Sequence, residues 1–222
     1  MADVFIAGGT GYMGQRLIPV LLQRGHTVGA LARLGSERKL PRECEVVQGD
    51  PLAPATFSGK VSPASTYVHL VGVAHPSPSK AAEFQAIDLK SIEIAVPAAV
   101  AAEVRHFVYV SVAHPAPMMK AYIEVRRRGE ELIRQSGLNA TVLRPWYVLG
   151  QGHRWPYLLK PAYFIAERLS STRESARRLG LVTLTQMITA LVHAVETPAN
   201  GIRVVEVPEI RAAQLSAVAT AS

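Results

Sequence analysis

Short apolar segments alternate with longer helical segments along the first 150 residues of the chain. The apolar segments predict β-strands at residues 4–7, 27–32, 45–48, 66–71, 106–110 and 139–143. Helices are predicted at residues 11–22, 80–103 and 118–135, with Pro97 as a kink in the second and Gly137 as the stop signal of the third. Strands that alternate with helices form parallel sheets through right-handed crossovers. The pattern therefore predicts an α/β fold with a doubly wound parallel sheet.

The types of residue along the sequence change after residue 150. An aromatic and basic helix is expected around residues 157–169, followed by a polar stretch, a short strand at 181–183, a helix at 185–196 and a last strand at 202–207. We interpret residues 1–150 as the main domain, 151–215 as a small C-terminal cap packed on it, and 216–222 as a frayed tail. Residues 155–169 form either a lid over a pocket or a contact with a membrane surface or another protein.

A glycine-rich turn joins the first predicted strand to the first helix. Its sequence is Gly8-Gly9-Thr10-Gly11-Tyr12-Met13-Gly14. Glycines at 8, 11 and 14 suit a tight turn, a close approach of the backbone to a pyrophosphate, and close packing of helix against strand. The helix N-terminus offers unpaired N–H groups and a positive dipole to an anion. The turn therefore predicts a nucleotide site, with an ordinary strand-to-helix connection as the alternative.

The residues after the second predicted strand favour NADP over NAD. An NAD site carries an acid about 20 residues beyond the glycine turn, where it binds the ribose 2′-OH. Here Arg33 stands at that place and Arg38 and Lys39 follow, with no acid before Glu37. A guanidinium can bind a 2′-phosphate through its planar fork of donors. The alternative is that Arg33 only caps the edge of the sheet.

Other candidate residues follow the later strands. Asp50 either accepts a hydrogen bond from adenine or caps a short helix near Pro51, and the two roles are compatible. Gly72 lets the backbone pass close to a ligand, and the fifth strand delivers Ser111 to the carboxyl edge of the sheet, where parallel sheets bind ligands. His75 and His114 lie on loops at the same edge and are either substrate contacts or surface residues.

Composition narrows the class of protein. The chain has 222 residues, a formal charge of +7 and one cysteine, Cys44. One cysteine excludes an internal disulfide framework and a multi-cysteine metal site, so we expect no metal and a cytoplasmic location. The basic residues are scattered without a DNA-reading motif, so we expect no nucleic-acid partner. No apolar stretch approaches the ~20 residues of a transmembrane helix.

Several motifs together resemble the short-chain dehydrogenase/reductase superfamily, in its atypical branch of small NAD(P)H-binding, epimerase/dehydratase-like proteins with a Rossmann fold. They are the glycine turn, Val47-Gln48-Gly49-Asp50, Phe107-Val108-Tyr109-Val110-Ser111, Ser136-Gly137-Leu138 and Leu143-Arg144-Pro145. The resemblance implies that Asp50 contacts adenine, that Val71 and Gly72 lie against the adenosine ribose, and that residues 145–148 line the nicotinamide pocket. The candidate cofactor-binding residues are Gly8, Thr10, Gly11, Tyr12, Met13, Gly14, Arg33, Arg38, Asp50, Leu52, Val71, Gly72, Pro145, Trp146 and Val148.

The same resemblance implies catalysis by a Ser or Thr, a Tyr and a Lys four residues after the Tyr. Ser111 and Tyr122 match, but Arg126 replaces the Lys, and Glu130 keeps the register of the family. Arg126 retains the positive charge yet cannot pass protons on, so proton relay should be impaired. Lys120 lies on a different helical face and is a poor substitute. The alternative for Tyr122 is an ordinary half-buried helix tyrosine.

Three functions are compatible with these residues. The first is an NADP(H)-dependent oxidoreductase that transfers hydride to or from a small or flat organic substrate, beneath a roof of Trp146, Tyr147, Trp155 and Tyr157. The second is a catalytically weak or inactive NADP(H)-binding sensor, regulator or assembly subunit. The third is direct hydride transfer to a quinone or flavin, which needs no Tyr–Lys pair. The sequence leaves turnover uncertain.

Overall fold

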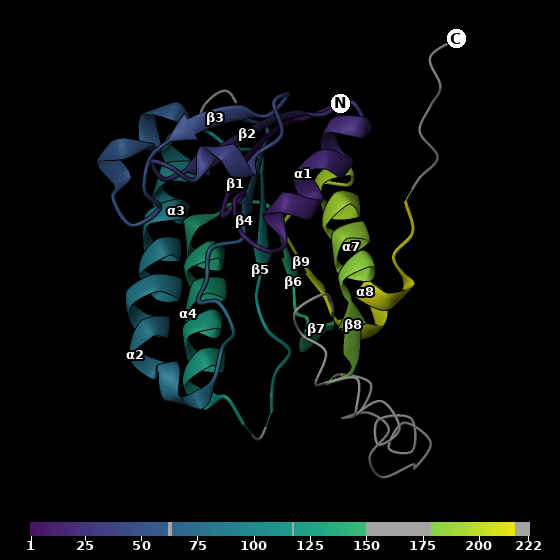
Figure 1. Ribbon diagram of the computed structural model, residues 1–222. Coiled ribbons are helices and arrows are strands. Elements are labelled where there is room, and N and C mark those ends of the chain that lie inside the picture. The colour runs from purple at the N-terminus through teal and green to yellow at the C-terminus, as the bar shows by residue number, and fades with distance from the viewer. Residues whose placement is uncertain (62–63, 117, 150–178, 216–222) are drawn as a thin grey trace.

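A seven-stranded parallel sheet forms the centre of the molecule. The computed structural model describes residues 1–61, 64–116, 118–149 and 179–215. The strand order is β3-β2-β1-β4-β5-β6-β9, and every neighbouring pair is parallel (Figure 1). The strands are β1 (Asp3–Ala7), β2 (Thr27–Ala32), β3 (Glu45–Gln48), β4 (Thr66–His69), β5 (His106–Val110), β6 (Ala140–Leu143) and β9 (Ile202–Val205). The predicted doubly wound fold is confirmed.

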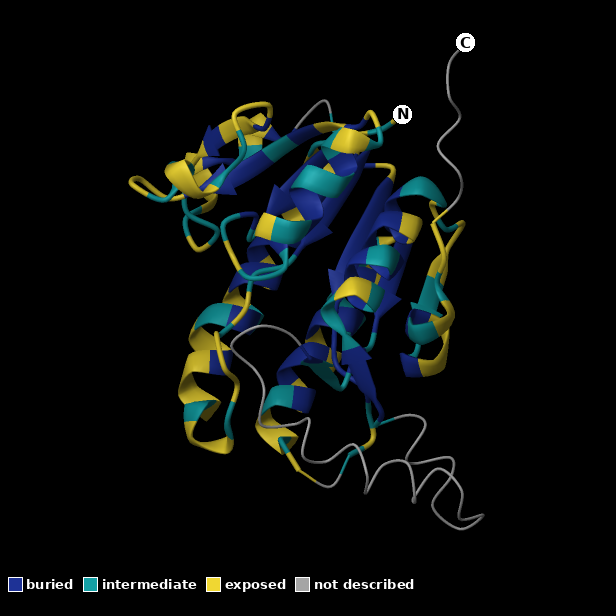
Figure 2. Cartoon of the chain, turned by 45° about the vertical axis from the view of Figure 1, so that its right-hand side comes forward, coloured by how far each residue is buried: buried dark blue, intermediate teal, exposed yellow. Residues whose placement is uncertain are grey.

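Helices cover both faces of this sheet. In Figure 1, α1 (Gly14–Gln23) and α7 (Leu184–Glu196) lie on one face, and α3 (Lys90–Ala101) and α4 (Lys120–Ser136) lie on the other. Each layer buries its own apolar cluster against the sheet, around Leu17 and Leu191 on the first face and around Phe107 and Ile133 on the second. Figure 2 shows the strands largely buried and the outward faces of the helices exposed, as expected for sheets covered on both sides.

The first two predicted helices differ most from the structure. The first helix begins at Gly14 rather than near Gly11, because the amide of Gly11 closes a tight turn onto the carbonyl of Gly8 (3.0 Å). The long helix predicted at 80–103 consists of three parts, α2 (Ala81–Glu83), the π-helical turn η5 (Phe84–Leu89) and α3. The described short 3₁₀ turns are η1 (Glu37–Lys39), η2 (Pro54–Thr56), η3 (Ser58–Lys60) and η4 (Pro78–Lys80).

The C-terminal third contributes directly to the main sheet. Strand β9 pairs with β6, and α7 packs against α1. A second, two-stranded sheet joins β7 (Tyr147–Leu149) to β8 (Leu181–Thr183), and α8 (Val207–Ala212) follows β9. Residues 150–178, which include the first part of the predicted cap and the whole 155–169 segment, lie outside the described residues, as does the predicted tail. The division of the chain after residue 150 therefore stays a prediction.

Candidate functional site

The glycine turn packs tightly because three of its residues, Gly8, Gly9 and Gly14, have no room for a side chain. Gly8 has φ +88°, and a Cβ there would lie 2.7 Å from the carbonyl carbon of Leu70 beyond β4. A Cβ on Gly14 would lie 2.5 Å from the carbonyl oxygen of Gly8. Only glycine tolerates both the positive φ and such contacts without strain. The turn is thus pressed between the start of α1 and the end of β4.

This turn also occupies the point where the strand order reverses. Strand β1 lies between β2 and β4, so the chain winds away from β1 in both directions. The amides of Met13 and Gly14 make no backbone hydrogen bond within the described part of the chain, and Gly11 is exposed. In open α/β sheets ligands bind at this switch point, with phosphates on the helix N-terminus. The residues present therefore fit a dinucleotide pyrophosphate.

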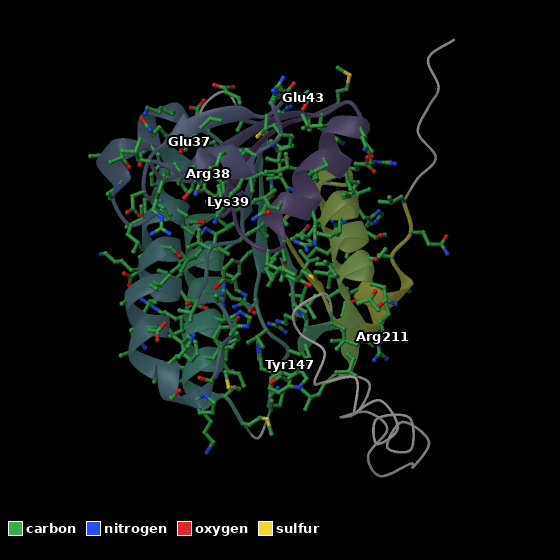
Figure 3. The ribbon with its side chains drawn as sticks, viewed as in Figure 1. Glu37, Arg38, Lys39, Glu43, Tyr147 and Arg211 are labelled. Atoms are coloured by element: carbon green, nitrogen blue, oxygen red, sulfur yellow. The ribbon has the colours of Figure 1, made fainter. Side chains whose placement is uncertain are left out.

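The basic residues expected near the ribose lie exposed beyond β2. Arg33 follows the last residue of β2, and Arg38 and Lys39 project from η1 (Figure 3). Neither Arg33 nor Arg38 has a side-chain hydrogen bond or ion pair to the rest of the described chain. Glu37 lies on the same turn, and its Oε2 is buried without a hydrogen-bond partner among the described residues. A phosphate and a ribose hydroxyl can both find partners here, so this turn does not distinguish NADP from NAD.

Asp50 uses one carboxylate oxygen within its own loop. Its Oδ1 accepts a hydrogen bond from the amide of Leu52 (2.9 Å), and its own amide donates to Thr56 Oγ1 (2.9 Å). These bonds fix the turn after β3, but η2, the first helical turn after Asp50, begins at Pro54 and has no side-chain cap, so the predicted capping of a helix near Pro51 is wrong. Leu52 is partly exposed. The adenine contacts of Asp50 and Leu52 stay predictions.

Arg126 lies in a buried ion pair. Its guanidinium donates to Asp88 Oδ1 (2.5 Å) and to the carbonyl of Val110 at the end of β5 (3.0 Å). The side chains are only 7% and 0% exposed for Arg126 and Asp88. Burial alone would lower the pKa of Arg126, but Tyr122, Tyr109 and Asp88 raise that pKa above its ordinary value. The side chain is therefore a fixed cation and not a proton carrier.

Tyr122 lies next to Arg126, as the four-residue spacing predicts. The guanidinium carbon of Arg126 is 5.1 Å from the centre of the Tyr122 ring, and Phe84 packs on the ring at 4.9 Å between centroids. Tyr122 is half-buried. The arginine therefore faces the ring of the tyrosine in a cation–π contact, and its guanidinium donates hydrogen bonds to Asp88 and to Val110.

Ser111 belongs to a second buried network. Its hydroxyl donates to Glu130 Oε1 (2.6 Å), and Arg144 donates to both oxygens of the same carboxylate (2.9 and 2.5 Å) and to Glu206 (2.9 Å). Burial alone would raise the pKa of Glu130, but the hydrogen bonds from Arg144 and Ser111 hold that pKa below its ordinary value. The hydroxyl proton of Ser111 is therefore already used in a hydrogen bond to an ionised carboxylate.

The remaining candidates lie along the same carboxyl edge. Val71 and Gly72 follow β4, and the carbonyl of Pro145 accepts from the amide of Ala113 (2.9 Å). Trp146 is partly buried, and Val148 lies in β7. The loop histidines differ, since His75 is exposed and His114 is half-buried with Nδ1 3.0 Å from the carbonyl of Val112. Trp155 and Tyr157, the other half of the expected roof, lie outside the described residues.

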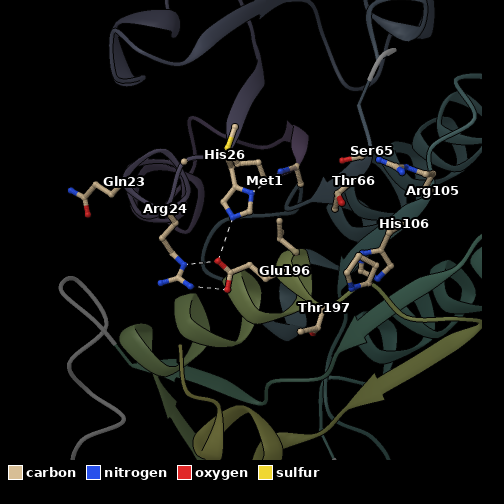
Figure 4. A pocket seen from close by; sticks show the side chains of 14 residues that line it. Met1, Gln23, Arg24, His26, Ser65, Thr66, Arg105, His106, Glu196 and Thr197 are labelled. Atoms are coloured by element: carbon tan, nitrogen blue, oxygen red, sulfur yellow. Dashed lines mark hydrogen bonds and ion pairs between the residues drawn. The ribbon is translucent and has the colours of Figure 1, made fainter. Parts of the chain in front are cut away.

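A cavity of about 890 Å³ lies at the opposite, amino edge of the sheet (Figure 4). Arg24 donates to both oxygens of Glu196 (2.5 and 2.9 Å), and Nε2 of His26 is 3.4 Å from the same carboxylate. Burial and Arg203 lower the pKa of the nearby His106 to about 4, so its ring is neutral at pH 7. The positive charge of Arg24 is already paired with Glu196, so it is not available to a phosphate. We therefore regard this cavity as a junction between α1 and α7 and not as the cofactor site.

The residues that the structure describes show neither a metal site nor a membrane-spanning helix. They contain no cluster of His, Cys, Asp and Glu that could hold a metal ion. Burial raises the pKa of the Cys44 thiol to about 11, which disfavours the reactive thiolate. None of the helices in the described ranges combines the length and apolar character needed to cross a bilayer.

Two important residues were not predicted. Asp88 was missed altogether, and Glu130 was used only to fix the register of the family motif. Both stand on otherwise buried helix stripes, Asp88 four residues after Phe84 and Glu130 four residues after Arg126. An acid on a buried stripe requires a partner, because an unpaired buried charge is costly. That periodicity is the signal that could have identified them.

Sequence comparison finds distant relatives of this chain among known proteins. The chain is 28% identical over 151 residues to the ceramide reductase of Caulobacter vibrioides, covering 67% of this chain and 47% of that protein. It is 24% identical over 150 residues to the photosystem II assembly factor Ycf39 of Cyanophora paradoxa, covering 64% and 44%. The chain thus spans less than half the length of these relatives.

The fold is shared with solved structures. The Bordetella bronchiseptica enzyme WbmH, in complex with NAD⁺, superposes with a TM-score of 0.69 at 19% identity, covering 93% of this chain and 75% of that one. The sequence model of the NAD(P)H-binding family matches residues 8–159. This range begins with the first glycine of the turn and includes every candidate catalytic residue. The chain therefore belongs to the NAD(P)H-binding family, and it shares its fold with solved structures of a short-chain dehydrogenase/reductase superfamily protein and of an epimerase.

Proposed function

We propose that the chain binds NADP(H) across the β1–α1 turn and transfers hydride between the nicotinamide and a small or flat organic substrate. The observation that carries this proposal is the turn itself, where Gly8 and Gly14 leave no space for side chains and two helix N-terminal amides remain available. An anion at this place is stabilised by the amides and the helix dipole together. Cytoplasmic location remains an expectation.

The preference for the phosphorylated cofactor rests on Arg33 and Arg38. Both guanidinium groups are exposed beyond β2 and have no side-chain partner in the described part of the chain. Guanidinium groups bind phosphate in bidentate fashion and carry their charge at all relevant pH values. Glu37 opposes this preference electrostatically, so the discrimination against NAD should be moderate.

The catalytic surroundings favour hydride transfer that does not depend on a proton relay. The nicotinamide supplies or accepts the hydride when the cofactor is bound. Arg126 and Ser111 already donate to Asp88 and Glu130, so neither is free to pass a proton to a substrate oxygen without breaking a buried bond. Tyr122 remains the candidate proton donor for carbonyl substrates. Quinones and flavins, which accept hydride directly, should therefore react faster than simple carbonyls.

A binding protein with little or no turnover is the second candidate. The hydrogen bonds from Arg126 to Asp88 and from Ser111 to Glu130 also support this alternative, because they occupy two of the candidate catalytic groups. The two relatives described above also differ, since one is named a reductase and the other an assembly factor. The predicted partner contact through residues 155–169 belongs to this alternative.

The proposal is tested by ligand-dependent stability. NADPH at 100 times its dissociation constant should raise the free energy of unfolding by about 2.7 kcal/mol, and NADH at the same concentration should raise it by less. Arg33→Ala should remove most of the difference between the two cofactors and leave NADH unaffected. Stabilisation by neither cofactor would contradict the binding site, and equal stabilisation would contradict the role of Arg33.

Turnover then separates the two candidates. NADPH oxidation is followed with a panel of quinones, flavins and carbonyl compounds, for the wild-type chain and Tyr122→Phe. We expect quinone reduction to persist in Tyr122→Phe and carbonyl reduction to be lost. Binding of NADPH without consumption by any acceptor would select the binding protein.

A further inference from the structure

The cavity at the amino edge of the sheet has two walls of different character. On one side the charges of Arg24 and Glu196 are paired with each other. Figure 4 shows Thr66, Arg105 and His106 on the other side. Thr66 and His106 are the first residues of β4 and β5, and they lie opposite each other in the register of the two strands. Two adjacent strands therefore build this second wall together.

His106 brings a buried polar ring to the second wall. The residue is 0% exposed, and its Nε2 lies 3.0 Å from Thr141 Oγ1 on β6, which also accepts a hydrogen bond from Arg203 (3.0 Å). No other acceptor for the Thr141 hydroxyl proton is present among the described residues, so this proton goes to Nε2. The neutral ring therefore carries its own proton on Nδ1, and Nδ1 has no partner in the described part of the chain.

Two further donors on the second wall also lack a partner. The guanidinium of Arg105 is exposed, and it makes no hydrogen bond or ion pair within the described ranges. The hydroxyl of Thr66 makes no hydrogen bond there either, although this residue is only 1% exposed. A buried donor without an acceptor is costly, because it has lost water and gained nothing in exchange. The second wall is therefore complementary to a ligand that accepts hydrogen bonds.

The charges around the cavity limit the ligand further. Arg24 and Glu196 offset each other, so the described wall keeps one uncompensated charge, that of Arg105. A phosphate dianion would bring a second charge that nothing on this wall neutralises. A neutral amide would leave the charge of Arg105 unmatched. A carboxylate carries one negative charge and two acceptor oxygens, and it forms strong hydrogen bonds with a guanidinium.

We propose that the second wall binds a small organic monocarboxylate, at a ligand site separate from the cofactor site. Arg105 matches the charge, and Thr66 and Nδ1 of His106 donate to the carboxylate oxygens. The apolar part of the acid lies against Val195, near the end of α7, and Pro198 just beyond it. The cavity volume of about 890 Å³ is within the range of small-molecule sites. Since the cofactor is proposed to bind at the carboxyl ends of the strands, this site does not depend on it.

The test is an NMR titration of the full ¹⁵N-labelled chain with hexanoate at pH 7. We expect saturable binding that shifts the Nδ1 signal of His106. Hexanamide has the same chain without the charge, and it should bind at least about tenfold more weakly. Inorganic phosphate should also bind more weakly than hexanoate. No saturable response to hexanoate, or equal or tighter binding of hexanamide or phosphate, would overturn the proposal.

Three variants locate the site. Arg105→Gln should weaken hexanoate about tenfold, because a charge-assisted bond is lost. Thr66→Val should weaken it about threefold without lowering the melting temperature, since the hydroxyl has no partner in the fold. Arg128→Gln is the matched control, because it removes an exposed charge from α4 on the other face of the sheet, and it should change the constant by less than about twofold. Equal effects of the two arginine substitutions would mean attraction by net charge alone and would contradict a built site.

A competition measurement establishes whether the site is separate. Hexanoate titrated in the presence of saturating NADPH should give the same dissociation constant within about twofold. Displacement of hexanoate by NADPH would place both ligands in one site and would overturn the proposal.

Discussion

Two charged residues on the buried stripe of α4 decide what the candidate catalytic groups can do. Arg126 and Glu130 are four residues apart and both are almost fully buried. Arg126 takes its acidic partner from η5, whereas Glu130 takes its partners from the loops after β5 and β6 and from Arg134 on its own helix. The predicted proximity of Tyr122 and Arg126 is present in the structure, because helical spacing is a local property. Their partners could not be predicted, because Asp88 and Arg144 approach only when the helices pack on the sheet.

The Glu130 network predicts a specific pH dependence of stability. Its folded-state pKa lies below the ordinary 4.5, so the carboxylate stabilises the fold above that value, and this contribution is lost as the pH falls through the folded pKa. Glu130→Gln should therefore lose about 3–5 kcal/mol of unfolding free energy at pH 7. The loss should shrink when urea unfolding is measured below pH 4. Equal losses at both pH values would contradict a charged Glu130.

A neighbouring acid provides the matched control. Glu131 stands on the same helix with its side chain 45% exposed, and it lies 3.6 Å from Arg134. Glu131→Gln should cost less than about 1 kcal/mol at pH 7, because exposed ion pairs contribute little. A similar effect of both substitutions would show that helix charge, and not the buried network, controls stability.

At the scale of elements, the sequence pattern predicted eight strands within two residues of their observed ends, and it predicted the major helices in order. The errors fall where tertiary contacts override local preference. Strand β4 stops at His69 and not at residue 71, because the chain beyond it turns to meet Gly8 and the Asp88–Arg126 pair. The π-helical turn η5 has no simple sequence pattern, and it places Asp88 under the sheet edge.

The β1–α1 turn can be tested with two glycines of similar conformation. Gly8 and Gly35 have φ values of +88° and +81°, but only Gly8 is crowded, since a Cβ on Gly35 would meet nothing within 4 Å. Gly35→Ala should cost about 1–2 kcal/mol of unfolding free energy from backbone strain alone. Gly8→Ala should cost about 1–3 kcal/mol more, because its Cβ would overlap Leu70. Urea unfolding of both variants measures the difference, and equal costs would contradict the tight packing of the turn.

At the scale of the whole molecule, the sheet is completed by a strand from the far end of the chain. A strand at residues 202–207 was predicted, but it was grouped with the cap, whereas β9 (Ile202–Val205) pairs with β6. Local patterning cannot reveal which strands are neighbours, since β9 and β6 are separated by about 60 residues that include the undescribed segment. The same limit applies to the substrate region, whose predicted lid residues lie in that segment.

The position of β9 and α7 predicts that the first 150 residues do not fold alone. Without them, β6 becomes an exposed edge, and α1 loses the apolar side chains of α7 that share its cluster, including Met187, Leu191 and Val195. Exposed strand edges and large apolar patches promote aggregation. A fragment of residues 1–150 should therefore lack a cooperative thermal transition by circular dichroism and should not bind NADPH. A fragment of residues 1–215, which lacks only the predicted tail, should melt like the full chain. Cooperative melting of the shorter fragment would instead establish a domain boundary at residue 150 and make β9 and α7 accessory.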